Sequence, residues 1–256
     1  MFRPRVIPVL LLKNRGLVKS VQFQNHKYIG DPINAVRIFN ELKADELVFL
    51  DIDASREQRT ISPSFVKDVG EEASMPFSVG GGIRSINDIA AIIEAGAEKV
   101  IIGAAAAKDP LFVKAAVDEF GSSTIVVCID VIRQRFGGQQ IRFLNGTLQN
   151  KQTPVEFAKL IESLGAGEII VQSIDRDGTM NGYDIELLSR VSKTVGIPVI
   201  ALGGAGSLSD MADACNQGGS SAVAAGSLFV YRDHNKGVLI NYPKKSECRS
   251  LKRSQV

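Results

Sequence analysis

The chain has 256 residues, of which 45% are hydrophobic and 23% are charged, and its 30 basic and 28 acidic residues give a formal net charge of +2. This composition is typical of a globular protein, and the length suits one large α/β domain. The nearly balanced charge argues against nucleic-acid binding through phosphate neutralisation, which requires a clear basic excess. No apolar run approaches the roughly 18 residues that span a bilayer. We therefore expect a cytoplasmic protein whose partners include neither nucleic acid nor a membrane.

A basic cluster marks the C-terminal end of the chain. Its members are Lys244, Lys245, Arg249, Lys252 and Arg253. Charged clusters at chain ends are usually solvated and poorly ordered. We therefore predict one barrel domain over residues 1–243 and a disordered basic tail over residues 244–256.

The cysteines and histidines indicate neither disulfide bonds nor a metal site. Cys128, Cys215 and Cys248 are spaced widely and irregularly, which suits neither a disulfide framework nor a zinc site. The two histidines, His26 and His234, are far apart. We expect no metal and no cofactor, and we interpret Cys128 as a small buried apolar residue of its strand.

Short apolar runs alternate along the chain with segments whose apolar residues recur at helical spacing. This alternation is typical of βα units whose parallel strands are buried on both faces. The predicted strands are residues 5–11, 46–52, 76–80, 99–103, 124–130, 168–174, 198–202 and 222–225. The predicted helices are residues 32–42, 86–94, 110–120, 154–164 and 184–194.

The two halves of the chain resemble each other at a constant offset. Gly82 corresponds to Gly204, and Pro76 corresponds to Pro198. Eight βα units with an internal repeat predict a (βα)8 TIM barrel made of two (βα)4 halves, because a repeat continues around a ring without leaving edges. The segment 131–152, rich in Gly, Gln and Asn, is predicted to form a mobile loop on the rim.

Small residues follow four of the predicted strands, at the end of the barrel where ligands bind in this fold. Glycine-rich turns surround Gly82 and Gly204, and the small residues Gly103, Gly226 and Ser227 follow the fourth and eighth strands. Glycine lets backbone amides approach an anion, and a helix N-terminus favours negative charge. We predict two symmetry-related phosphate sites and a ligand phosphorylated at both ends. Plain tight turns are the alternative interpretation.

Carboxylates gather near the same end of the barrel. Asp130 ends the fifth strand, where partial burial raises a pKa towards neutrality and suits a general acid or base. A hydrogen-bond acceptor for loop amides is the structural alternative. After the sixth strand, Asp177, Gly178 and Thr179 are candidate ligand-binding residues, or members of an Asx turn.

The repeat places Leu11 at the position that matches Asp130. Leucine cannot transfer a proton, so a mechanism that needs two carboxylates lacks one of them. Lys19 and Asp51 are the nearby polar candidates, either as support for the site or simply as an ion pair.

Charged residues open four strands at the opposite, N-terminal rim. They are Arg5, Glu46, Lys99 and Glu168. Solvated strand ends are one interpretation. The other is a ring of ion pairs at the barrel floor, which could gate a passage for a small neutral molecule.

The chain up to about residue 230 resembles the HisF family, the cyclase subunit of imidazole glycerol phosphate synthase. The matching motifs are RVIP at 5–8, ADELVFLDI at 44–52, VGGGIR at 79–84, DRDGT at 175–179, GYD at 182–184 and GGAG at 203–206. The resemblance implies a heterodimer with a HisH-like glutaminase, whose ammonia enters the floor and reaches a bisphosphorylated ribulosyl substrate at the top.

The resemblance also implies roles for particular residues. Asp130 matches one of two catalytic aspartates, and the charged residues of the floor match the ammonia gate. Phosphate binding is implied for Gly82, Asp177, Thr179, Gly204 and Ser227.

Two departures from the family pattern stand out. Leu11 replaces the other catalytic aspartate, and Gly103 with Ala104 replaces an Asn-Thr pair at one phosphate site. These changes resemble a paralogous branch associated with acetamidino modification of surface-polysaccharide sugars, whose members work with a glutaminase and an asparagine-synthetase-like amidotransferase.

Three hypotheses follow. The leading one is a barrel that supplies ammonia for amidination of a nucleotide sugar in lipopolysaccharide or O-antigen biosynthesis. The first alternative is a histidine-pathway cyclase that makes imidazole glycerol phosphate and aminoimidazole carboxamide ribotide. The second is a non-catalytic scaffold that activates a glutaminase. The expected small-molecule partner is phosphorylated.

Overall fold

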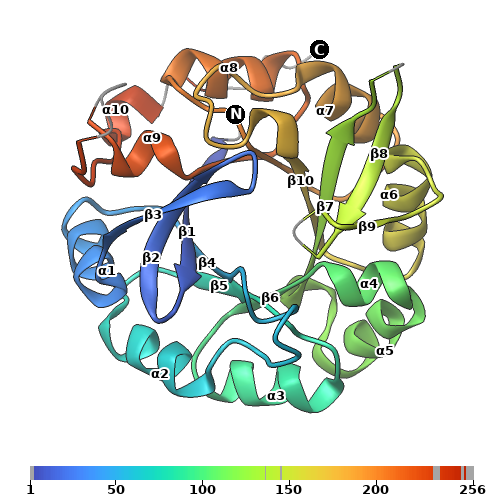
Figure 1. The fold of residues 1–256 in the computed structure, drawn as a ribbon, viewed down its shortest axis with the longest axis horizontal. Helices are drawn as coiled ribbons and strands as arrows, with labels where there is room; N and C mark the ends of the chain where they lie inside the picture. Colours follow the sequence, from blue (N-terminus) through green and yellow to red (C-terminus); the bar gives the residue numbers. More distant parts are fainter. Residues whose placement is uncertain (1–2, 136, 145, 233–236, 249–250, 252–256) are drawn as a thin grey trace.

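The chain forms the predicted closed barrel of eight parallel strands (Figure 1). The computed structural model describes residues 3–135, 137–144, 146–232, 237–248 and 251. Pairing of β10 with β7 closes the ring. In chain order the strands are β1 (Arg5–Lys13), β4 (Leu47–Asp51), β5 (Phe77–Gly80), β6 (Lys99–Ile102), β7 (Ile125–Arg133), β10 (Glu168–Ser173), β11 (Val199–Leu202) and β12 (Ala222–Ala225).

Helices surround the ring, and the residues that cap them can be recognised in the sequence. Ser85 and Ser207 each begin a helix with a capping box, closed by Asp88 and Asp210 respectively. The long helices are α1 (Pro32–Glu41), α2 (Pro63–Glu72), α3 (Ile86–Glu94), α5 (Leu111–Phe120), α6 (Pro154–Ser163), α7 (Ile185–Ser192) and α8 (Leu208–Asn216). The short ones are α4 (Ala104–Lys108), α9 (Ser227–Val230) and α10 (Lys245–Cys248). Within the described residues, none of the helices has the length and apolarity to cross a membrane.

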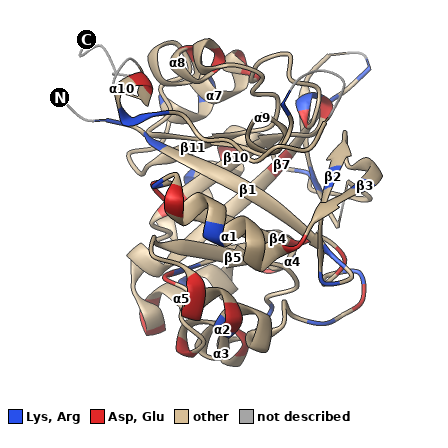
Figure 2. Cartoon of the chain, turned by 90° about the vertical axis from the view of Figure 1, so that its left-hand side faces the viewer, with Lys and Arg blue, Asp and Glu red and all other residues tan. Residues whose placement is uncertain are grey.

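Two antiparallel additions extend the barrel at its mouth. β2 (Gly16–Val21) and β3 (Gln24–Gly30) form a hairpin on β1 that the sequence did not predict. The hairpin lies at the opposite end of the barrel from the start of β1 (Figure 2).

The second addition corrects a prediction. The segment 131–152 is predicted to be a mobile loop on the rim, but β7 continues into it and pairs with β8 (Gln139–Phe143), which pairs with β9 (Leu148–Gln149). The reason is the alternation around Ile141 and Phe143, whose side chains are buried while their neighbours are more exposed.

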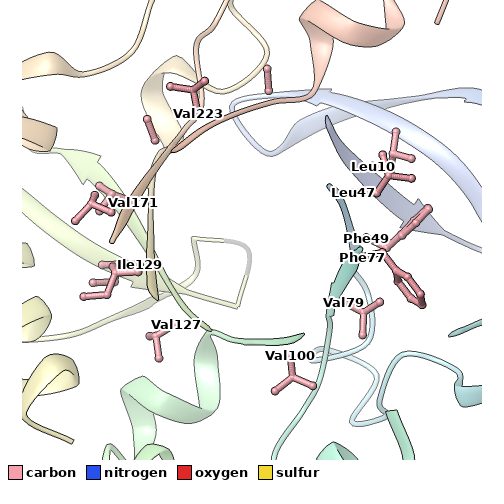
Figure 3. Packing of buried hydrophobic residues seen from close by; sticks show 14 of the residues in the cluster. Leu10, Leu47, Phe49, Phe77, Val79, Val100, Val127, Ile129, Val171 and Val223 are labelled. Carbon is pink, nitrogen blue, oxygen red and sulfur yellow. The ribbon is translucent and has the colours of Figure 1, made fainter. Parts of the chain in front are cut away.

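Two apolar layers are separated by the strands. The outer layer lies between strands and helices, and Figure 3 shows Val127, Ile129 and Val171 among its members. The inner layer fills the barrel, with Ile7 and Val9 contributed by β1. Side chains of a strand alternate between its two faces. Leu11 therefore shares the inner face of β1, just as Asp130 shares the inner face of β7 with Cys128.

The end of the chain differs from the predicted solvated tail. Cys248 and Leu251 are buried in the outer layer, so this part of the segment 244–256 packs on the barrel. Arg249, Lys252, Arg253 and the earlier His234 lie outside the described residues.

Tyr242 joins the C-terminal segment to the first βα unit. Its ring packs against Phe39 and Phe229. Its hydroxyl donates to the Val6 carbonyl at 2.9 Å and accepts from the Asp45 amide at 3.1 Å. One side chain thus satisfies two backbone groups at the N-terminal end of the barrel.

We predict that Tyr242→Phe lowers the free energy of unfolding by about 1–3 kcal/mol, because it leaves both backbone groups without their partner. Urea unfolding followed by circular dichroism measures this change. Tyr28→Phe is the matched control, since Tyr28 is 66% exposed and should alter stability little. Equal stability of the two variants would show that the Tyr242 hydroxyl anchors nothing.

Candidate functional site

A cavity of about 140 Å³ opens at the C-terminal ends of the strands. The predicted site residues Asp51, Gly82, Gly103 and Asp130 line it, together with Leu11. The position of the cavity agrees with the general location of ligand sites in this fold.

Two smaller cavities, each of about 20 Å³, adjoin this region on the side of β12. Lys19, Asp177, Gly226 and Ser227 line one of them. The other brings Asp177 and Ser227 together with the predicted residues Gly178, Gly204 and Gly226. Thr179 has a structural role in this loop: its hydroxyl donates to the Arg176 carbonyl at 2.8 Å and closes the local turn.

Asp130 is the carboxylate best placed for proton transfer. Burial, with the nearby Asp177, raises the pKa of Asp130 to about 7, against the effect of a hydrogen bond from Cys128 that lowers it. That bond joins the Cys128 Sγ to the Asp130 Oδ1 at 3.5 Å. A carboxyl group with this pKa exchanges a proton near neutral pH, which suits acid–base work.

Leu11 faces the same cavity as Asp130. Its backbone lies between Leu50 of β4 and Val18 of β2, so the first strand delivers an apolar side chain to the mouth. At the two positions that the repeat relates to each other, the cavity therefore has an apolar side chain, Leu11 on β1, and one carboxyl group, Asp130 on β7.

Lys19 is the buried cation of the mouth. Its Nζ donates to the Val9 carbonyl at 2.7 Å, and burial lowers its pKa to about 8, against the attraction of Asp177. Asp177 in turn accepts from the Ser20 hydroxyl at 3.1 Å. A Cβ atom at Gly226 would lie 2.2 Å from the Lys19 Nζ, so this glycine makes room for the lysine.

Asp51 has a partner that the sequence did not reveal. Arg59 donates to both of its carboxylate oxygens, and the amides of Asp53 and Ala54 donate to Oδ1. The carboxylate thus shapes the loop after β4. That loop also requires a glycine at position 82, because a Cβ atom on Gly82 would lie 1.8 Å from the Arg59 carbonyl oxygen.

The four charged residues of the floor form a connected set of ion pairs. Arg5 contacts Glu46 and Glu168, each at 2.6 Å, and Lys99 lies 3.2 Å from Glu168. The Ser78 hydroxyl, which sequence reasoning missed, donates to Glu46 at 2.8 Å. Lys99 also lies 3.9 Å from Glu46, so the four residues form a closed ring of ion pairs.

Sequence reasoning also missed several residues of the mouth. Ser20, Phe23 and His26 reach it from the unpredicted β2–β3 hairpin. Gln172 lines it from β10, where the alternation of side chains could have identified it. Cys128 is buried as expected, but it also donates to Asp130.

The fold and the mouth define a (βα)8-barrel protein with a candidate small-molecule site and a charged floor. A family model described as "Histidine biosynthesis protein" matches residues 5–235. The chain belongs to this family, as a HisF-like homologue of the cyclase subunit of imidazole glycerol phosphate synthase.

Individual relatives extend over nearly the whole chain. Subunit hisF2 of Pseudomonas aeruginosa is 47% identical over 243 residues, which cover 95% of this chain and 97% of that protein. Subunit hisF3 of Vibrio vulnificus is 44% identical over 248 residues, covering 96% and 95%. Subunit HisF of Alkaliphilus metalliredigens is 43% identical over 233 residues, covering 91% and 92%.

The raised pKa of Asp130 predicts a pH-dependent stability. Between the ordinary pKa of 3.8 and about 7, the carboxyl group is protonated in the folded chain and ionised in the unfolded one. The folded state then binds the additional proton, so stability falls as pH rises through this window. At about 1.4 kcal/mol per pKa unit, the expected loss is about 4 kcal/mol.

Asp130→Asn removes this titration. We expect the free energy of unfolding of the wild type, measured in urea from pH 4 to pH 8, to fall relative to that of the variant. Parallel curves would mean that Asp130 titrates normally.

Proposed function

We propose that this chain delivers ammonia, released by a HisH-like glutaminase partner, to an amidination reaction. The observation that carries the proposal is the pairing of an intact charged floor with a mouth that offers Leu11 beside Asp130. Such a barrel keeps the parts for admitting ammonia and has lost one of two acid–base groups.

The floor supports the admission of ammonia. Arg5 and Lys99 are held between the carboxylates of Glu46 and Glu168, so the N-terminal opening is covered by charges that compensate one another. These side chains are mostly buried, with exposures of 6–27%, so separating the ion pairs requires a compensating contact. They can open locally when a partner docks against the floor.

The interior of the barrel suits the passage of a neutral molecule. Above the floor, the inner layer is apolar and includes Ile7, Val48 and Ile170. An apolar interior disfavours ammonium, because burying an unpaired charge costs much more than burying a neutral molecule. Movement of these packed side chains would let ammonia through while keeping water and ions out.

The acceptor is proposed by resemblance. Loss of the first-strand aspartate matches the branch associated with acetamidino sugars, and relatives named hisF2 and hisF3 share 44–47% identity with this chain. We propose a nucleotide sugar of lipopolysaccharide or O-antigen biosynthesis as the acceptor. An asparagine-synthetase-like amidotransferase is the proposed enzyme that uses the ammonia.

A second candidate function is a working cyclase. Lys19 favours it, because a lysine with a pKa of about 8 can exchange a proton near neutral pH. Asp51 is a poorer substitute, since Arg59 and two loop amides occupy its oxygens. A glutaminase-activating scaffold is the third candidate.

An obstruction inside the barrel tests ammonia delivery. Ala224 belongs to the inner layer and Ala225 to the outer layer of the same strand. Ala224→Leu should reduce glutamine-driven amidination by about tenfold or more, and Ala225→Leu should not, although overpacking costs each about 1–3 kcal/mol. Amidinated product is measured in the complete complex with glutamine or with ammonium chloride.

Ammonium chloride should rescue Ala224→Leu, because ammonia from solution bypasses the barrel. Full glutamine-driven activity of a folded Ala224→Leu protein would support the scaffold and overturn the proposal.

A further inference from the structure

We infer that the mouth binds a small molecule with an anionic group at one end only, held on the Lys19 side, and an uncharged group in the 140 Å³ cavity. The inference goes beyond ammonia delivery, since it concerns what the mouth recognises. It also departs from the sequence-based prediction of a ligand phosphorylated at both ends.

The large cavity lacks a counter-charge for a phosphate. None of its described lining residues is Lys or Arg. Asp51 and Asp130 contribute carboxyl groups, and Arg59 is already bound to Asp51 and Glu57. Burial and the nearby Lys13 lower the pKa of His26, which keeps its ring neutral at pH 7. An anion here would meet carboxylates without a compensating cation.

Hydrogen-bond donors are also scarce at this end. The Gly82 amide, a predicted phosphate ligand, already donates to the Ser55 hydroxyl at 3.2 Å. Gly103 and Ala104 bring no side-chain donor to the start of α4, and Gly103 makes no side-chain cap. A phosphate would have to displace Ser55 to gain the Gly82 amide.

The walls of the large cavity suit an uncharged group with an apolar side. Leu11, Leu50, Ile83 and Phe143 supply apolar surface. Gln172 adds an amide on the same lining. A neutral group that presents carbon to the leucines and hydrogen-bonding atoms to Gln172 fits this arrangement.

The opposite end has the charge that an anion needs. Lys19 is the one Lys or Arg among the described residues that line the three cavities. It lies beside Ser227 and beside Gly226, whose missing side chain leaves room for the Lys19 Nζ. An arriving anion would compete with Asp177 for the lysine, and it would favour the charged form of Lys19.

Matched sugar phosphates test the inference without a glutaminase or an acceptor, so its outcome is separate from that of ammonia delivery. Binding of fructose 6-phosphate and fructose 1,6-bisphosphate to the full chain is measured by isothermal titration calorimetry. We expect fructose 6-phosphate to bind at one site, at least as tightly as fructose 1,6-bisphosphate, because the second phosphate would meet Asp51 and Asp130 without a compensating cation. A bisphosphate preference of about tenfold or more, or binding of neither sugar, would overturn the inference.

Two variants test which end of the mouth binds the uncharged group and which end binds the anionic group. Gly103→Asn combined with Ala104→Thr supplies donors to the large cavity, where a Cβ atom at Gly103 has ordinary van der Waals space. This variant should prefer the bisphosphate by about tenfold, a difference of about 1.4 kcal/mol. An unchanged ratio in the folded variant would count against the assignment of this end.

Lys19→Met should raise the dissociation constants of both sugar phosphates by about tenfold. Lys27→Met is its control, because Lys27 is exposed and pairs with Lys19 on the same hairpin. Thermal unfolding verifies that both variants fold. Equal binding by the two folded variants would show that Lys19 does not bind the anionic group.

Discussion

The alternation of side chains along the barrel strands is the constraint on which the rest of the structure depends. Because every second residue of β1 points inward, the register that buries Ile7 and Val9 also carries Leu11 to the mouth. The same rule on β7 carries Asp130 there. A shift of one residue in either strand would place the apolar interior against the helices. The chemistry of the mouth is therefore tied to the packing of the core.

The same alternation links the two ends of the barrel. Arg5 occupies the inner face of β1 at the floor, and Leu11 occupies it at the mouth. The floor keeps a full set of ion pairs, while the mouth has Leu11 at the position that the repeat matches to Asp130. The proposed delivery of ammonia without ring chemistry depends on this contrast.

Much of the fold could be predicted because it depends on local patterns. The eight strands follow apolar runs, and helices such as α1 and α6 follow an N-cap and a proline. The internal repeat stays a prediction, although the turns that precede α3 and α8 share the same capping box. The β2–β3 hairpin was missed because most of β3 is exposed and has no apolar pattern.

The details of the site depended on contacts between distant residues. The partner of Asp51 is Arg59, on a loop without regular structure, and no spacing rule pairs them. The burial of Lys19 arises from the hairpin that was not predicted. Packing of Leu251 on the barrel likewise contradicts what charge alone suggested for the C-terminal segment. The sequence thus located the mouth and the floor, whereas the charges within the mouth required the structure.

The most direct measurement of the central claim is cyclase turnover. The purified chain is given ammonium chloride and the bisphosphorylated ribulosyl-carboxamide substrate, and formation of imidazole glycerol phosphate is compared with that of Asp130→Asn. Because Leu11 stands where a second carboxyl group would face Asp130, the pair needed for acid–base catalysis is incomplete, and we expect turnover within about twofold of this variant. Turnover about a hundredfold above the variant would contradict the account, because it would show a working cyclase that uses Asp130 with another proton-transfer group.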